Sequence, residues 1–250
     1  MSSDADVPGH LVNQARRLAA ECFPDALSVV LAGSVASGRA TTTSDLDIAV
    51  LIADGGETRR DTLRFEERVV ELFIHTRAGL GELFAADAAS RRGVMQHMYA
   101  DGLVLRERDG AATRIKQHAE DALREGPGAL APATVESRRY ALTDALDDLV
   151  DAADVVERLV VASVVLSTAA DLLFDHRRAW TGSGKWLSRR LLQADPDHGG
   201  ALLEGYRRLC EEGEPEDFAD AAVEVLALMG GPIREGYART WRDATEPAAR

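Results

Sequence analysis

The 250-residue chain has little of several features that mark particular protein classes. Its two cysteines, Cys22 and Cys210, give no disulfide framework, which favours a reducing compartment. The longest apolar runs, such as residues 159–166, are too short to span a bilayer. Residues 1–10 lack the charged-then-apolar pattern of a signal segment. We therefore expect a cytoplasmic protein with no membrane partner.

Positive charge is also scarce, because the formal net charge is −13. Proteins that bind nucleic acid usually carry a basic patch, so a nucleic-acid partner is not expected. The acidity favours a neutral or cationic small partner instead. With 46% hydrophobic and 28% charged residues, the composition is that of a globular chain with one large domain or two ordinary ones.

The first half of the chain mixes helical and strand patterns. Helices are predicted over 10–22, 35–39, 80–97 and from the Asp109-Gly110 turn to residue 124; strands are predicted over 27–32, 45–52, 68–75 and 102–106. We therefore expect an α/β (α+β) domain with a small mixed sheet.

The segment Gly126-Pro127-Gly128 is the clearest break in the chain, and it predicts domains over residues 1–128 and 129–250. No strand pattern appears after it. An apolar stripe from Leu142 to Val160 predicts one long amphipathic helix. Further helices are predicted over 160–178, 184–194, 198–211 and 216–229, which together indicate an all-α helical-bundle domain.

The residues best suited to chemistry lie near the N-terminus. A Gly33-Ser34 turn is followed twelve residues later by Asp45 and Asp47, inside an apolar strand pattern. Because strand side chains alternate, the two carboxylates share one face. Two like charges held so close are costly unless a cation lies between them. A small turn beside a carboxylate pair that can hold Mg²⁺ is what transfer from a nucleoside triphosphate requires.

A third carboxylate, Glu71, lies in the middle of the apolar strand predicted over 68–75. If that strand pairs with the strand of Asp45 and Asp47, Glu71 completes a three-carboxylate cluster. Three interpretations stay open: a metal ligand or orienting group, which we favour, a general base for the acceptor hydroxyl, or a surface residue of an edge strand.

The pattern of Gly33, Ser34, Asp45 and Asp47 resembles the nucleotidyltransferase superfamily of the DNA polymerase β type. The chain also looks like the small bacterial aminoglycoside-type nucleotidyltransferases that have a helical C-terminal domain. This likeness rests on the two-half layout and on two segments, Asp101-Gly-Leu-Val-Leu and Trp180-Thr-Gly-Ser-Gly-Lys-Trp-Leu. The resemblance implies that Asp45, Asp47 and Glu71 are catalytic and bind Mg²⁺. It also implies nucleotide binding, for which the candidates are Gly33, Ser34, Arg39, Ser44 and Lys185.

The activity implied by the resemblance is antibiotic resistance by Mg²⁺-dependent transfer of a nucleoside monophosphate. AMP would be transferred from ATP to a hydroxyl group of a small, cationic, aminoglycoside-like acceptor. The helical domain would bind this acceptor, and the protein would be a monomer or a homodimer. One alternative is a nucleotidyltransferase that modifies a protein or tRNA, as in toxin–antitoxin systems. Another is a non-catalytic nucleotide-binding homologue.

Several roles in the rest of the chain stay open. Glu136 is either the general base or a solvated acid near a helix start. Lys185 in a Gly-rich turn, like Arg39 after the first turn, is a candidate phosphate contact. The acidic run of the second half either attracts a cationic acceptor or is simply the water-facing side of its helix; it comprises Asp144, Asp147, Asp148, Asp151 and Asp154.

Overall fold

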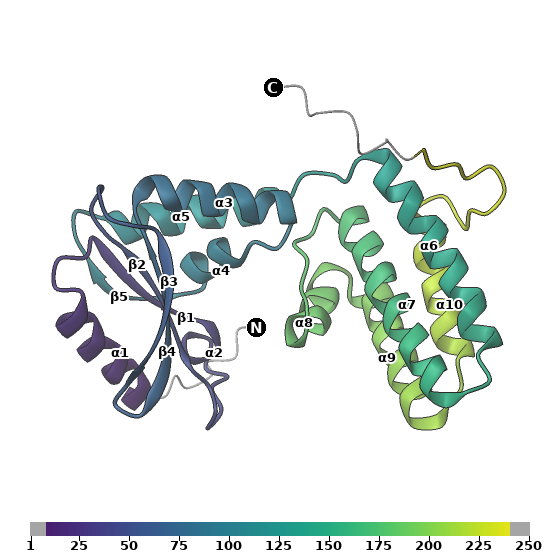
Figure 1. Ribbon diagram of the computed structural model, residues 1–250, viewed down its shortest axis with the longest axis horizontal. Helices are drawn as coiled ribbons and strands as arrows, with labels where there is room; N and C mark the ends of the chain where they lie inside the picture. Colours follow the sequence, from purple (N-terminus) through teal and green to yellow (C-terminus); the bar gives the residue numbers. More distant parts are fainter. Residues whose placement is uncertain (1–8, 241–250) are drawn as a thin grey trace. The chain divides into compact units, whose positions relative to one another are not determined.

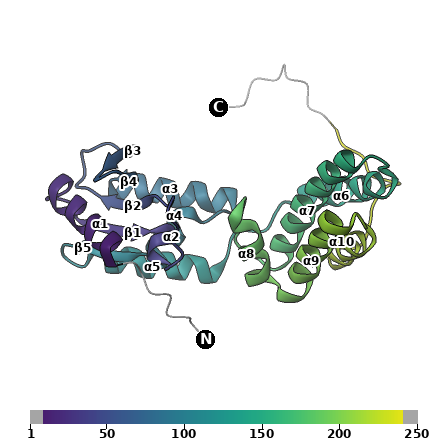
Figure 2. The same ribbon diagram turned by 90° about the horizontal axis from the view of Figure 1, so that it is seen from below.

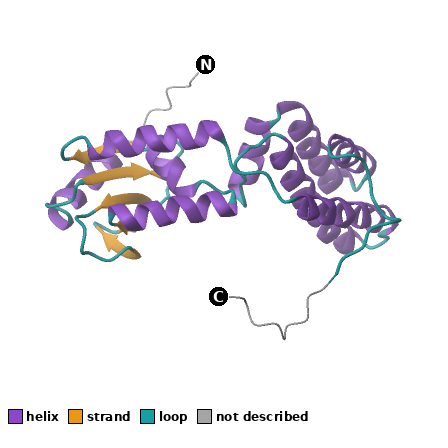
Figure 3. Cartoon of the chain, turned by 90° about the horizontal axis from the view of Figure 1, so that it is seen from above, coloured by secondary structure: helices purple, strands orange, loops and turns teal. Residues whose placement is uncertain are grey.

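The computed structural model describes residues 9–240, which divide into two compact units with the boundary after Gly128 (Figure 1). The first unit contains a five-stranded sheet and five helices, and the second contains helices only within residues 129–240 (Figure 3). No helix in the described part of the chain is both long and apolar enough to cross a membrane.

The sheet has the strand order β3-β4-β2-β1-β5. Its members are β1 (Ser28–Ala32), β2 (Leu46–Leu51), β3 (Arg59–Phe65), β4 (Arg68–His75) and β5 (Leu103–Glu107). β2 and β4 pair in parallel, whereas the other neighbours are antiparallel, so the sheet is mixed as predicted.

Each face of the sheet has its own core. α1 (Gly9–Cys22) covers one face, where Leu18 packs with Ile48 and Leu72. The other face is covered by α3 (Arg77–Ser90), α4 (Val94–Ala100) and α5 (Ala111–Glu125) (Figures 1 and 2). A single turn of helix, α2 (Gly33–Ala36), follows β1 directly. Alternation along the central strands sends their side chains to the two cores in turn.

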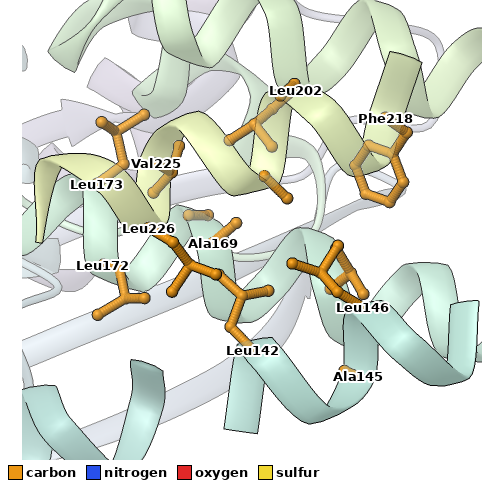
Figure 4. Close-up of a cluster of buried hydrophobic side chains, with 14 of the residues drawn as sticks. Leu142, Ala145, Leu146, Ala169, Leu172, Leu173, Leu202, Phe218, Val225 and Leu226 are labelled. Carbon is orange, nitrogen blue, oxygen red and sulfur yellow. The ribbon is translucent and has the colours of Figure 1, made fainter. Parts of the chain in front are cut away.

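The second unit packs five helices around one apolar core. They are α6 (Pro132–Asp151), α7 (Val155–His176), α8 (Lys185–Ala194), α9 (Pro196–Glu212) and α10 (Glu216–Leu228). Figure 4 shows Leu142 and Leu146 of α6 among side chains of α7, α9 and α10, including Leu172, Leu202 and Leu226.

Three of the predicted helices were wrong in extent. The helix predicted over 35–39 begins and ends earlier, because α2 spans Gly33–Ala36 and Ser37 is its C-cap. The helix predicted over 80–97 is divided into α3 and α4, because Arg91 and Gly93 adopt the left-handed backbone conformation between them. The single long helix predicted from Leu142 to Val160 is divided into α6 and α7. Asp154 begins α7 by accepting hydrogen bonds from the N–H groups of Val156 and Glu157, both at 2.9 Å.

Candidate functional site

Three carboxylates gather at one end of the central strands. Asp45 directly precedes β2, Asp47 is the second residue of that strand, and Glu71 lies in β4. In the parallel β2–β4 pair, Asp47 is directly opposite Glu71. One carboxylate oxygen of each residue lies within 4.8 Å of the others, and all three residues are partly buried.

The apolar side chains of the two strands bring these carboxylates together. Leu46 and Ile48 of β2 are fully buried toward α1, as is Val70 of β4. A strand whose even-numbered residues face that core must turn Asp47 and Glu71 to the opposite face. A slip of one residue would bury both acids, so the hydrophobic pattern itself sets the register.

Gly33 completes one wall of the site. Its φ is +69°, in the left-handed region, and a Cβ atom at this position would collide with Oδ2 of Asp47. Glycine is therefore required twice, for the turn and for the close approach of the backbone to the carboxylate. The preceding residue, Ala32, pairs with Asp47 across β1 and β2, which fixes that approach.

A small network joins the turn to the acidic strand. The hydroxyl of Ser34 donates to the hydroxyl of Ser44 at 3.1 Å, and the backbone N–H of Thr41 donates to the same Ser44 oxygen at 2.8 Å. The Arg68 guanidinium donates to the backbone carbonyl of Ser44. Arg39 is exposed, and its own N–H donates to the carbonyl of Ser34 at 2.8 Å. Four of the predicted nucleotide-binding residues therefore lie in one short segment.

Arg60 was not predicted as a site residue. It belongs to β3, a strand that the sequence pattern did not reveal. Its guanidinium forms an ion pair with Glu71 at 2.6 Å and lies 4.8 Å from the centre of the Phe73 ring. The signal available was the alternation of Leu63 and Phe65 with charged neighbours, which is typical of an edge strand.

The remaining predicted residues belong to the second unit. Lys185 is the exposed first residue of α8, and Glu136 is exposed on α6. Within the acidic run, Asp154 is the N-cap of α7 and Asp147 contacts Arg234. These two aspartates therefore have structural partners, whereas Asp144, Asp148 and Asp151 are exposed on α6.

The carboxylate cluster has the chemistry of a site for a hard divalent cation. Magnesium prefers oxygen ligands and usually takes one or two carboxylates from the protein. Asp45, Asp47 and Glu71 supply such oxygens close together, and the ion pair with Arg60 offsets only part of their charge. The residues present therefore fit a Mg²⁺ ion.

A known domain family includes the residues of this site. Residues 12–81 match the nucleotidyltransferase domain family, a range that includes Gly33 and all three carboxylates. No curated protein matches the chain at a significant level. Among solved structures, a nucleotidyltransferase-like protein from Exiguobacterium sibiricum is similar with a TM-score of 0.43 and 15% identity, over 88% of this chain and 74% of that one. Residues 12–81 of the chain therefore carry a nucleotidyltransferase domain.

Proposed function

We propose that the protein transfers AMP from ATP to a hydroxyl group of a small molecule, with Mg²⁺ as cofactor. The observation that carries the proposal is the cluster of Asp45, Asp47 and Glu71 beside the Gly33-Ser34 turn. In this proposal, residues 1–128 form the catalytic domain and residues 129–250 the acceptor-binding domain.

The turn after β1 would bind the phosphates. The N–H groups in the first turn of a helix have no partner within that helix, so those of Ser34 and Val35 can donate to phosphate oxygens. Gly33 leaves the backbone accessible there, and the Ser34–Ser44 hydrogen bond holds the turn in place. Arg39 and Lys185 are exposed cations that we propose as further candidate phosphate contacts.

The carboxylates would hold the metal, which supplies charge neutralisation for the triphosphate when bound. The acceptor hydroxyl attacks the α-phosphorus in line, its proton leaves to a base, and the bond to pyrophosphate breaks. Glu71 is already held by Arg60 through one carboxylate oxygen, which suits an orienting ligand better than a mobile base. Glu136 remains our candidate for the base.

The acceptor we favour is a hydroxylated cation of the aminoglycoside type, which would make the protein an antibiotic-resistance enzyme. The net charge of −13 and the exposed acids Asp144, Asp148 and Asp151 support a cationic acceptor. The same acidity disfavours tRNA, the acceptor in the alternative function.

The proposal is tested with Asp45→Asn and Asp47→Asn, which remove one negative charge each while keeping side-chain size. We expect pyrophosphate release from ATP and Mg²⁺, measured over a panel of acceptors, to fall at least 100-fold in both variants, with circular dichroism unchanged. Asp61→Asn is the matched control, because Asp61 pairs with Arg59 and lies opposite Leu72, on the sheet face toward α1 rather than that of the carboxylates.

Labelled ATP identifies the transferred group. Label on the α-phosphate should appear in the modified acceptor, and label on the γ-phosphate should leave with pyrophosphate. Transfer of the γ-label would contradict the proposal, as would full activity in either asparagine variant. Binding of ATP without turnover of any acceptor would favour the non-catalytic alternative.

A further inference from the structure

A pocket of about 280 Å³ lies between α3 and α5, at the far end of β2 from the carboxylates. Its lining includes Leu51, Leu80, Phe84, Arg77, Arg114 and His118. Leu51 lies four residues beyond Asp47 on the same strand, a separation of about 13 Å at the usual rise of a strand. The pocket is therefore distinct from the carboxylate site.

The floor and walls of this pocket are apolar. Leu51, Leu80 and Phe84 are at least nine-tenths buried. The Phe84 ring stacks on the His118 imidazole with centroids 5.5 Å apart and planes inclined by 13°, which presents a flat surface. Interiors are normally close-packed, so a hollow with such walls suits the apolar body of a ligand. Its volume is near the lower end of the range for ligand sites, about 300–1,000 Å³.

The two charged side chains that line the pocket, Arg77 and Arg114, are both cationic. Arg77 and Arg114 line it together with His118, and no carboxylate of residues 9–240 does. Arg77 also contacts Asp54 at 3.4 Å, outside the lining. Glu107 is a nearby counter-charge for Arg114. Within residues 9–240, no carboxylate accepts a hydrogen bond from the Arg114 guanidinium. Guanidinium groups bind carboxylate and phosphate oxygens in pairs.

We propose that this pocket binds a small free organic anion with a flat apolar body and one carboxylate or phosphate group. The body occupies the space between Leu51, Leu80 and Phe84, and the anionic group is bound by Arg77 and Arg114. The site lies wholly within the first unit and does not depend on which acceptor the enzyme modifies.

The experiment uses 2-naphthoate as the probe and its neutral amide, 2-naphthamide, as the matched ligand, with binding to the full-length protein measured by isothermal titration. We expect naphthoate to bind at least tenfold more tightly than naphthamide. Arg114→Gln should weaken naphthoate about tenfold and leave naphthamide unchanged, because only the charge-assisted contact is lost.

Gly81→Leu tests the location. Gly81 lines the pocket from α3, and a Cβ atom there meets nothing within 4 Å, so a leucine can extend into the hollow without displacing its neighbours. We expect this variant to lose naphthoate binding. Glu82→Leu, the exposed neighbour on α3 outside the lining, is the matched control and should bind as the parent does.

Each contrary outcome overturns the proposal. Equal affinity for naphthoate and naphthamide would remove the anionic requirement, and undiminished binding by Gly81→Leu would place the probe elsewhere. Absence of naphthoate binding at millimolar concentration would show that the pocket does not take this class. If Gly81→Leu fails to fold by circular dichroism, Arg114→Gln with the two ligands decides the question.

Discussion

At the scale of single residues, the buried imidazole of His75 affects the stability of the domain and lies on the same strand as Glu71 of the candidate site. It ends β4, the strand of Glu71, and is fully buried against α4. Its Nε2 lies 2.6 Å from the hydroxyl oxygen of Tyr99. Burial lowers the pKa of His75 to about 4, because a charged imidazole would lose its hydration there.

This pKa predicts an acid-sensitive fold. The unfolded imidazole takes up a proton near pH 6.5 and the folded one only near pH 4, so the unfolded state binds more protons between these values. The contribution of the neutral His75 to the free energy of unfolding is therefore fully present above pH 6.5 and is lost as the pH falls toward 4. We expect the free energy of unfolding to drop by about 3 kcal/mol from this group, measured by urea unfolding across that range.

His75→Gln provides the comparison for this prediction. It cannot take up the proton, so its unfolding free energy should be lower than that of the parent at pH 7 but should fall less between pH 6.5 and 4. Parallel pH profiles for the two proteins would show that His75 is not the responsible group.

Residue patterns also limited what could be predicted of the site. Asp45, Asp47 and Glu71 were predicted to cluster because an acid within an apolar strand stands out in the sequence, and the structure brings them together. Arg60 does not stand out, since it is one of several charged residues in its segment. Its contact with Glu71 arises only from the pairing of β3 with β4, which is a non-local property.

At the scale of elements, the β3–β4 hairpin is the part of the sheet that the sequence pattern did not predict, because no strand was expected over residues 59–65. Its two-residue turn is Glu66-Glu67, with φ values of +45° and +67°. Such turns normally carry Asn-Gly, which was the missing signal. Interactions with α1 hold the strained turn: Gln14 donates to the carbonyl of Phe65 at 2.9 Å, and Arg17 pairs with Glu66 at 2.6 Å.

Relief of that strain should stabilise the protein. In Glu67→Gly, the left-handed conformation no longer opposes a side chain, and we expect a gain of about 0.5–1 kcal/mol in unfolding free energy, measured from the urea midpoint at constant slope. Glu67→Ala removes the same charge but keeps the strain, so it should give no gain. A gain of equal size in both variants would assign the effect to charge.

Helix ends were predictable where the sequence carried a known signal and not elsewhere. The break at Gly126-Pro127 was visible and coincides with the boundary between the compact units. The end of α6 was not visible, because the apolar stripe continues through Val156 and Val160 in the sequence, whereas these two side chains are 68% and 60% exposed in the structure. Capping by Asp154 outweighs the periodicity at that point.

At the scale of the whole molecule, the two units have separate cores. One cluster draws only on residues of the second unit, and the clusters on the two sheet faces draw only on the first. All three tryptophans, Trp180, Trp186 and Trp241, occur after residue 128. Tryptophan fluorescence should therefore report on the second unit alone.

This distribution gives a test of independent unfolding. Leu149 is fully buried in the second unit, and Leu149→Ala should cost about 2–5 kcal/mol and lower the urea midpoint seen by fluorescence. Leu72→Ala, the matched change in the first unit, should leave that midpoint in place while shifting the transition seen by far-ultraviolet circular dichroism. A common shift in both signals would show that the units unfold together.

The position of β3 at the outside of the sheet has a consequence for the protein in solution. An outer strand presents unpaired N–H and C=O groups to which another chain can add, and that is a route to aggregation. β3 carries charged side chains along this row, namely Arg59, Arg60, Asp61 and Arg64. Arg60, which forms the ion pair with Glu71, thus also belongs to the row of charges that opposes the addition of another chain to the sheet.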